Sequence, residues 1–474
     1  MLLSFNKQII LFLIIATGTL FRFYNVSFDD LWYDEIISFW VANPNFSFKE
    51  SLIFHNQIET TSILYNIILK NFFKIFDYSV FSGRIFSAFW GVLSIFTIIY
   101  LDKKLNKNSN SYLLSSFLIS LNIFLIGFSQ ELRNYTLLFF VTSLTLIFFI
   151  KLLENRKNYI LLFFFSVIFL FNILLHPFGF LIFFSLSFYL FLELIFKKKF
   201  SIPIISVFLV VFIFSAFYYF QLFYITTNSD ADYYWFMENP SLKFYTNFHF
   251  SNYFGSRLVG GVFLIVFLYL IIKNFKKIME INYYTLFFII IVFSYLIPIV
   301  FGYLFKPMLL PRHTMFNLIP IILLLSNLIF NYENKKNKYF LIILLAFLTI
   351  GNHFTEQTIK QFYKERIPSK PEYSKAVNYI KNSETKNFII KIENMKDNKA
   401  SLNAIQNYIF HLDKDLTPIQ ISNFKSGKQK FWYFCPLDIN SKDCYLPKNI
   451  KDRSIILRQK QFNSIILNLV EINI

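Results

Sequence analysis

The sequence predicts a polytopic α-helical membrane protein with about eleven transmembrane helices, external interfacial helices and a small soluble C-terminal α/β domain. Three observations predict this fold class. Of the 474 residues, 55% are hydrophobic and only 16% are charged, which is too apolar for a soluble protein of this size. Long apolar stretches alternate with short loops, and every second loop is basic. After about residue 355 the apolar runs stop and polar residues become frequent.

Apolar stretches that are long enough, or nearly long enough, to cross a bilayer occur about eleven times, since a membrane helix needs about 20 apolar residues. The first stretch lacks a small-residue cleavage site, so we expect it to remain as a membrane helix. The stretches cover residues 8–24, 84–101, 111–129, 134–150, 158–175, 176–192, 200–221, 258–272, 283–305, 314–331 and 339–354.

Clusters of lysine and arginine predict the orientation. They follow the second, fourth, sixth, eighth and tenth stretches, and by the positive-inside rule these loops face the cytoplasm. The N-terminus is then inside, residues 25–83 and 355–474 are outside, and we expect the bacterial cytoplasmic (inner) membrane. The net charge of +18 comes largely from these clusters and does not indicate nucleic-acid binding, which favours a basic stripe with interleaved aromatic residues.

Two domains are expected: residues 1–354 in the membrane, including the external loop 25–83, and residues 355–474 outside it. In the loop, "SFKE" at 47–50 predicts a capping box that begins a short helix. The stretch 60–76 predicts an interfacial helix, because Asn66, Lys70 and Lys74 form one polar stripe at helical spacing.

The C-terminal domain is expected to mix helices and strands. Its two cysteines, Cys435 and Cys444, form either a disulfide, which an oxidising outer compartment favours, or two free thiols. Helices are expected at 372–382 and 402–411, and strands at 387–392, 430–435 and 454–459.

Four carboxylates open the external loop: Asp29, Asp30, Asp34 and Glu35. Asp34 and Glu35 lie among aromatic residues in "LWYDEIISFW", where a partly desolvated carboxylate is useful as a base. The alternative for all four is structural, because Asp is a common helix N-cap and acidic residues favour the first helical turn. We consider that alternative the better explanation for Asp29 and Asp30.

Four segments in order resemble one family. They are "FRFYNVSFDDLWYDEIISFWVANP" at 21–44, "FSGRIFSAFWGVLSIF" at 81–96, "SQELRNYTL" at 129–137 and "LLPRHTMFNLIP" at 309–320. This set resembles polyprenyl-phosphate-dependent glycosyltransferases of the GT-C fold, in the family 39 or RgtA/B/C/D-like group. That group includes protein O-mannosyltransferases and lipid A aminoarabinose transferases.

The resemblance implies an inverting transfer of a hexose or pentose from a polyprenyl-phosphate sugar to a lipid, glycan or protein acceptor. Asp34 would be the general base, and Glu35 an orienting or substrate-binding neighbour. One departure concerns the acceptor side: many members carry an acidic residue and His-Pro-Pro where this chain has "IETTSILY" at 58–65, with Glu59 standing in for the acid. Asp30 and Tyr135 complete the expected acceptor or sugar contacts.

Outward-facing cations near the bilayer surface are the expected partners of the donor phosphate: Arg133, Arg312, Lys306 and His176. Arginine is favoured because its planar guanidinium grips two phosphate oxygens. The alternative is that these side chains only reach from the interface to water. Likewise, "DADYYWFMENP" at 230–240 is either a sugar contact or a surface loop with an aromatic belt.

No metal-ligand spacing, P-loop or dinucleotide fingerprint appears, so no cofactor or metal is indicated. Two other functions remain as alternatives. A lipid or oligosaccharide flippase or transporter would favour inverted repeats and broken helices, which are not evident. An oligosaccharide ligase or polymerase would favour a large late external loop, whereas here the acidic residues come early.

Overall fold

A computed structural model describes residues 2–59, 61–107, 109–227, 249–305, 307–355, 358–390, 399–419, 427–437 and 444–473. The chain divides into two compact units. The membrane unit consists of residues 1–24, 85–222 and 233–366, and the loop-domain unit consists of residues 25–84, 223–232 and 367–474. The loop 25–83 therefore folds with the C-terminal domain, although nearly 300 residues separate them in the sequence.

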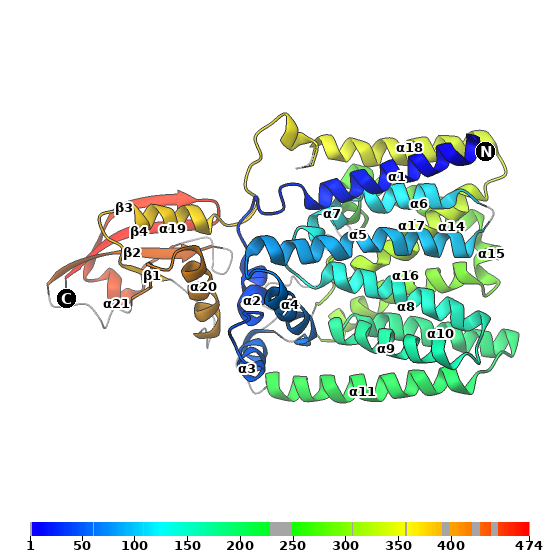
Figure 1. The fold of residues 1–474 in the computed structure, drawn as a ribbon, viewed down its shortest axis with the longest axis horizontal. Coiled ribbons are helices and arrows are strands. Elements are labelled where there is room, and N and C mark those ends of the chain that lie inside the picture. Colours follow the sequence, from blue (N-terminus) through cyan, green and yellow to red (C-terminus); the bar gives the residue numbers. More distant parts are fainter. Residues whose placement is uncertain are drawn as a thin grey trace. The chain divides into compact units, whose positions relative to one another are not determined.

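All eleven apolar stretches expected from the sequence are helical (Figure 1). The helices are α1 (Leu2–Phe23), α5 (Val80–Leu105), α6 (Ser111–Ser120) with α7 (Ile123–Ser129), α8 (Tyr135–Glu154), α9 (Tyr159–Leu175), α10 (Gly179–Lys197), α11 (Ile202–Thr227), α14 (Arg257–Lys273), α16 (Tyr283–Leu304), α17 (Leu318–Phe330) preceded by η1 (Met315–Asn317), and α18 (Lys335–Thr355). Short helices α13 (His249–Tyr253) and α15 (Phe275–Met279) precede α14 and α16, and η2 (Lys360–Phe362) follows α18.

The protein is a multi-pass helical membrane protein. Within the described residues, seven helices are long and apolar enough to cross a membrane, and the bent pair α6 and α7 makes an eighth if it is one span. Helix α9 and the segment Met315–Phe330 are shorter apolar helices, and α14 has 17 residues. The count of about eleven crossings therefore stays a prediction.

The outer helices of the membrane unit expose large apolar side chains. Phe12 on α1, Phe214 on α11 and Phe347 on α18 are each more than 60% exposed. Figure 1 shows α11 along one edge of the helical bundle and α1 with α18 along the opposite edge. In helix α8, in contrast, 72% of the most apolar 18-residue segment is buried. Such extensive apolar exposure on the outer helices is suited to lipid rather than to water.

The bend between α6 and α7 leaves backbone carbonyl groups without hydrogen-bond partners inside a helix. Side chains from other helices donate hydrogen bonds to these groups instead. The two helices meet at 52°. Arg22 donates to the carbonyl oxygens of Ile119 (3.0 Å) and Ser120 (2.7 Å), and His353 bonds that of Leu121 (2.8 Å). The Arg22 in the quoted "FRF" segment thus has a structural task, because helix ends buried without partners are costly.

Replacing Arg22 by Met should lower the melting temperature of the detergent-solubilised protein by several degrees. Methionine keeps an apolar stem but cannot donate, and each buried carbonyl group left unsatisfied costs about 1–3 kcal/mol. Arg257→Met is the matched control, because Arg257 is exposed at the start of α14. Equal melting temperatures for the two variants would show that the bend does not need the guanidinium.

In the loop-domain unit, the loop 25–83 folds into three helices: α2 (Tyr33–Val41), α3 (Phe48–Ile58) and α4 (Leu64–Ile75). The capping box expected at 47–50 is confirmed. The Ser47 hydroxyl accepts from the Glu50 amide at 3.2 Å, and the Glu50 carboxylate accepts from the Ser47 amide at 2.7 Å.

The polar stripe on α4 packs mainly against α3 rather than facing water, and the interfacial placement of this helix stays a prediction. Asn66 and Lys70 are buried, and Asn66 bonds the ring of His55 at 3.1 Å. Lys70 donates to the Ser51 hydroxyl at 2.9 Å and to the carbonyl oxygen of Phe46. Only Lys74 of the stripe is exposed. A helical polar stripe has the same spacing whether its partner is water or a neighbouring helix.

The C-terminal domain has a four-stranded sheet in the order β1-β2-β4-β3. Its elements are α19 (Tyr373–Lys381), β1 (Phe388–Ile390), α20 (Lys399–Leu412), β2 (Lys428–Pro436), α21 (Lys448–Lys451), β3 (Ser454–Phe462) and β4 (Ile465–Asn473). All five expected elements are confirmed. Strand β4, which the sequence analysis does not anticipate, pairs antiparallel with both β2 and β3.

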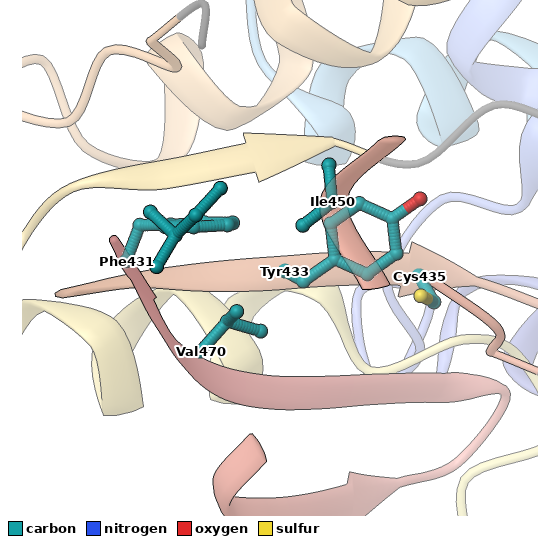
Figure 2. Close-up of a cluster of buried hydrophobic side chains, with 6 residues drawn as sticks. Phe431, Tyr433, Cys435, Ile450 and Val470 are labelled. Atoms are coloured by element: carbon teal, nitrogen blue, oxygen red, sulfur yellow. The ribbon is translucent and has the colours of Figure 1, made fainter. Parts of the chain in front are cut away.

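One hydrophobic cluster of this domain lies on one face of β2 and β4, and the opposite face of β2, with Trp432 and Phe434, is buried as well. Figure 2 shows Phe431, Tyr433 and Cys435 of β2 with Val470 and Ile450, all of them buried. The core residues of β2 are two apart because alternate side chains share one face of a strand. Cys435 forms a disulfide with Cys444, which decides between the two alternatives that the sequence left open.

Candidate active site

The Asp34–Glu35 pair lies in the first turn of α2, which begins directly after Trp32. Asp34 is partly buried, whereas Glu35 is fully buried. The amide groups at a helix N-terminus favour negative charge, so this turn suits both carboxylates. The two neighbours nevertheless have different environments, because successive side chains on a helix point in different directions.

Glu35 is locked by two cations. Arg84 grips it with two hydrogen bonds of 2.9 Å, one to each carboxylate oxygen, and Lys370 donates to Oε2 at 2.8 Å. Burial by itself would raise the pKa of Glu35, but the charges and hydrogen bonds of Arg84 and Lys370 outweigh burial and hold it below its usual range. Glu35 is therefore an ionised positioning group and is poorly suited to carry a proton.

Arg84 also organises the chain that leads to α2. Its guanidinium donates to the carbonyl oxygens of Val26 (3.1 Å), Asp29 (2.6 Å) and Asp30 (2.9 Å). Its side chain is almost completely buried. Sequence reasoning placed this arginine only within a quoted segment, and it did not find Lys370 at all. No local signal marks Lys370, which lies among other lysines of the C-terminal domain.

Asp29 and Asp30 hold the C-terminal domain to the loop rather than capping α2. Asp29 accepts from the amide (2.9 Å) and hydroxyl (3.1 Å) of Ser369, and Asp30 accepts both groups of Ser374 at 2.7 Å. Because Ser374 lies in the first turn of α19, Asp30 caps that distant helix. Burial raises the pKa of Asp30, although the Ser374 bonds oppose that effect.

Helix α20 completes the frame around α2. The Tyr33 hydroxyl lies 2.5 Å from that of Ser401, and the hydroxyl of Tyr408 accepts from the Leu31 amide at 3.2 Å. Both bonds are made by residues that come just before Asp34 in the sequence. Glu59, the expected acceptor contact, is partly buried and lies at the C-terminal end of α3.

In the membrane unit, a second cluster gathers three of the predicted phosphate partners. His176 ends α9, Tyr135 begins α8, and their rings are 6.5 Å apart. The Arg133 guanidinium lies 5.9 Å from the centre of the Tyr135 ring. His313, which follows Arg312, has its ring centre 4.9 Å from that of His176 and 6.3 Å from that of Tyr135.

His313 was missed by sequence reasoning, which singled out only its neighbour Arg312. Burial lowers the pKa of His313 well below its usual range, and the charges of His176, Arg312 and Arg133 lower it further. The cluster of Arg133, Arg312, His176, His313 and Tyr135 is hereafter the cationic cluster. The predicted partner Lys306 and the segment 230–240 lie outside the described residues.

No group of three His, Cys, Asp or Glu side chains is arranged to hold a metal ion in the parts of the chain that the structure describes. The acidic cluster of Asp29, Asp30, Asp34 and Glu35 belongs to the loop-domain unit, and the cationic cluster belongs to the membrane unit. A carboxylate suits proton abstraction, and arginines suit an anion with several oxygens.

Comparison with solved structures gives the fold. ArnT from Cupriavidus metallidurans bound to undecaprenyl phosphate matches with a TM-score of 0.52 and 10% identity, over 96% of this chain and 97% of that chain. The Archaeoglobus fulgidus oligosaccharyltransferase in its apo form matches with a TM-score of 0.51 and 9% identity, over 89% of this chain and 62% of that chain. The chain has the GT-C fold.

The resemblance noted in the sequence is thus confirmed at the level of the GT-C fold, and placement in the family 39 group stays a prediction. No protein-family model matches the sequence, and neither does any curated protein. Identities of 9–10% leave substrate and acceptor to be argued from the residues of this chain.

Proposed function

We propose that this chain is a membrane glycosyltransferase. It transfers a hexose or pentose from a polyprenyl-phosphate donor to lipid A, a glycan or a protein at the outer face of the cytoplasmic membrane. The observation that carries the proposal is the GT-C fold over nearly the whole chain, shared with a protein solved with undecaprenyl phosphate. The acidic and cationic clusters supply the groups that this reaction needs.

Asp34 is the proposed general base. A sugar on a lipid phosphate already has a good leaving group, so the enzyme must chiefly deprotonate the acceptor hydroxyl and stabilise the phosphate. Of the two neighbouring carboxylates, Glu35 is fully buried and held by Arg84 and Lys370, so we assign proton transfer to Asp34, which is partly exposed. A single base without a covalent sugar intermediate gives inversion at the anomeric carbon.

The cationic cluster is the proposed site of the donor phosphate. Arg133 and Arg312 would grip its oxygens, with His176 and Lys306 as further partners. Tyr135 and Glu59 remain candidates for sugar or acceptor contacts. Asp30, proposed from the sequence for the same task, already accepts two bonds from Ser374, and we assign it to positioning α19 instead.

The identity of the sugar donor tests this proposal. Purified protein in nanodiscs should transfer sugar from one member of a panel of undecaprenyl-phosphate hexoses and pentoses, and should ignore the matching nucleotide sugars. The physical reason is that the short cytosolic loops carry no phosphate-cradling glycine motif, so a nucleotide sugar has no binding site there. Efficient transfer from a nucleotide sugar without any lipid intermediate would overturn both the donor and the proposed orientation.

Orientation is testable with single cysteines at exposed positions, in a background with Cys435 and Cys444 replaced by Ser. Lys49 in the external loop and Lys414 after α20 should react, as cysteines, with an impermeant thiol reagent on intact spheroplasts. Lys336→Cys, exposed at the start of α18 in a basic loop, is the control that should react only after permeabilisation. The reverse labelling pattern would place the acidic cluster in the cytosol.

A further inference from the structure

Two histidine rings lie side by side in the cationic cluster. His176 and His313 have ring centres 4.9 Å apart, inclined at 45°. His176 is buried and His313 is partly buried. The proposed function uses His176 only as one phosphate partner among several and gives His313 no role.

Backbone groups assign the tautomer of each neutral ring. The Nδ1 atom of His176 accepts the Phe178 amide at 3.2 Å, so the proton of neutral His176 is on Nε2. The Nδ1 atom of His313 lies 3.3 Å from the carbonyl oxygen of Met308, which can only accept. Neutral His313 therefore carries its proton on Nδ1 and a basic lone pair on Nε2.

The surroundings of His313 oppose a second proton. Among the described residues, the titratable groups around it include His176 from the end of α9, Arg133 and Tyr135 from the start of α8, and its own neighbour Arg312. Burial and the positive charges both disfavour the imidazolium. An anion placed among these groups reverses the electrostatic balance, because it attracts the charge that the arginines repel.

We propose that His313 is a proton-accepting residue of the donor-phosphate subsite, neutral in the protein alone and protonated when the phosphate of the lipid carrier binds. This inference rests on the proposed function of the cationic cluster. His313 thus supplies a positive charge that is present only with the anion, whereas the two arginines are charged at all times.

The chemistry of transfer fits such a group. As the acceptor oxygen bonds to the anomeric carbon, the bond from that carbon to the phosphate oxygen breaks and its electron pair stays on the phosphate. The acceptor proton passes to Asp34. The phosphate changes from a diester with one negative charge to a monoester, which carries about −1.5 to −2 at neutral pH. His313 then takes a proton from water, and its positive charge balances the negative charge that the phosphate has gained.

Calorimetry with undecaprenyl phosphate tests the proposal on the full chain in nanodiscs. Titrations in buffers of different ionisation enthalpy report the protons taken up on binding. On binding, wild type should take up about one proton more than His313→Gln. For each unit by which the pH is lowered, the affinity of wild type for undecaprenyl phosphate should rise by up to about tenfold more than that of His313→Gln. His313→Phe serves as a second variant, and His411→Gln, at the end of α20, is the histidine control.

The outcomes separate the two proposals. Loss of the extra proton in both His313 variants, with uptake unchanged in His411→Gln, supports the assignment. Binding with no uptake beyond the ionisation of the lipid itself, measured on wild type alone, overturns the role of His313 and leaves the phosphate site intact. Absence of any binding of undecaprenyl phosphate at all pH values overturns the phosphate site and the His313 role together.

Discussion

Asp34→Asn should lower the rate of sugar transfer by about 10²–10⁴, because asparagine keeps the shape of the side chain but cannot accept a proton. The protein should remain folded, since the fully buried Glu35, which the variant keeps, carries ion pairs with Arg84 and Lys370. The measurement is turnover in nanodiscs with the undecaprenyl-phosphate sugar that wild type accepts, at saturating donor. Affinity for undecaprenyl phosphate should change little, because the phosphate is assigned to the cationic cluster.

Two comparisons make this result specific. Asp452→Asn, at an exposed position of the C-terminal domain, should leave turnover unchanged. Glu35→Gln should instead reduce the amount of folded protein, because it weakens the bonds to two cations. If Asp34→Asn kept more than about a third of wild-type turnover, Asp34 would not be the base and Glu59 would be tested next.

Arg84→Met should destabilise the loop-domain unit by about 3–5 kcal/mol, the usual cost of removing one partner from a buried ion pair. The variant leaves the fully buried Glu35 with Lys370 alone and removes donors from three backbone carbonyl groups. Protease sensitivity of residues 25–83 and 367–474 in nanodiscs reports this loss, since cleavage follows the opened population.

A double-mutant cycle isolates the contribution of charge. Arg84→Met with Glu35→Leu should be less destabilised than the sum of the two single variants, because no buried carboxylate then lacks its main partner. Strict additivity would contradict the ion pair as the source of the effect. In wild type the pKa of Glu35 is lowered by folding, so its contribution is present above about pH 4.3 and is lost as pH falls toward its folded pKa.

These contacts give the C-terminal domain a definite task. Ser369, Lys370 and Ser374 bind Asp29, Glu35 and Asp30 respectively, so the segment that enters the domain runs along the acidic loop. Helix α20 adds Ser401 and Tyr408. The proposed base therefore sits on a helix whose first turn is framed by residues more than 300 positions away in the sequence.

Much of the fold was predictable because its signals are local. A bilayer demands long apolar stretches, and all eleven appeared as helices. The Ser47–Glu50 capping box depends on residues three apart, and the helices and strands of the C-terminal domain depend on short periodic patterns. Strand β4 was not predicted, although its sequence "IILNLVEIN" suits a strand.

The sequence by itself determined the membrane class, the positions of the helices and the presence of an acidic pair beside aromatic residues. Only the tertiary structure decided what each polar residue contacts. Glu35 and Asp34 are neighbours with equal local signals, yet Glu35 is fully buried against Arg84 and Lys370 whereas Asp34 is partly exposed. The periodicity of the sequence indicates which side of a helix is polar. It does not indicate which residue will pair with a buried charge, because that partner comes from a distant part of the chain when the protein folds. For the same reason the sequence did not single out His313, whose proposed role follows from the position of its ring next to that of His176.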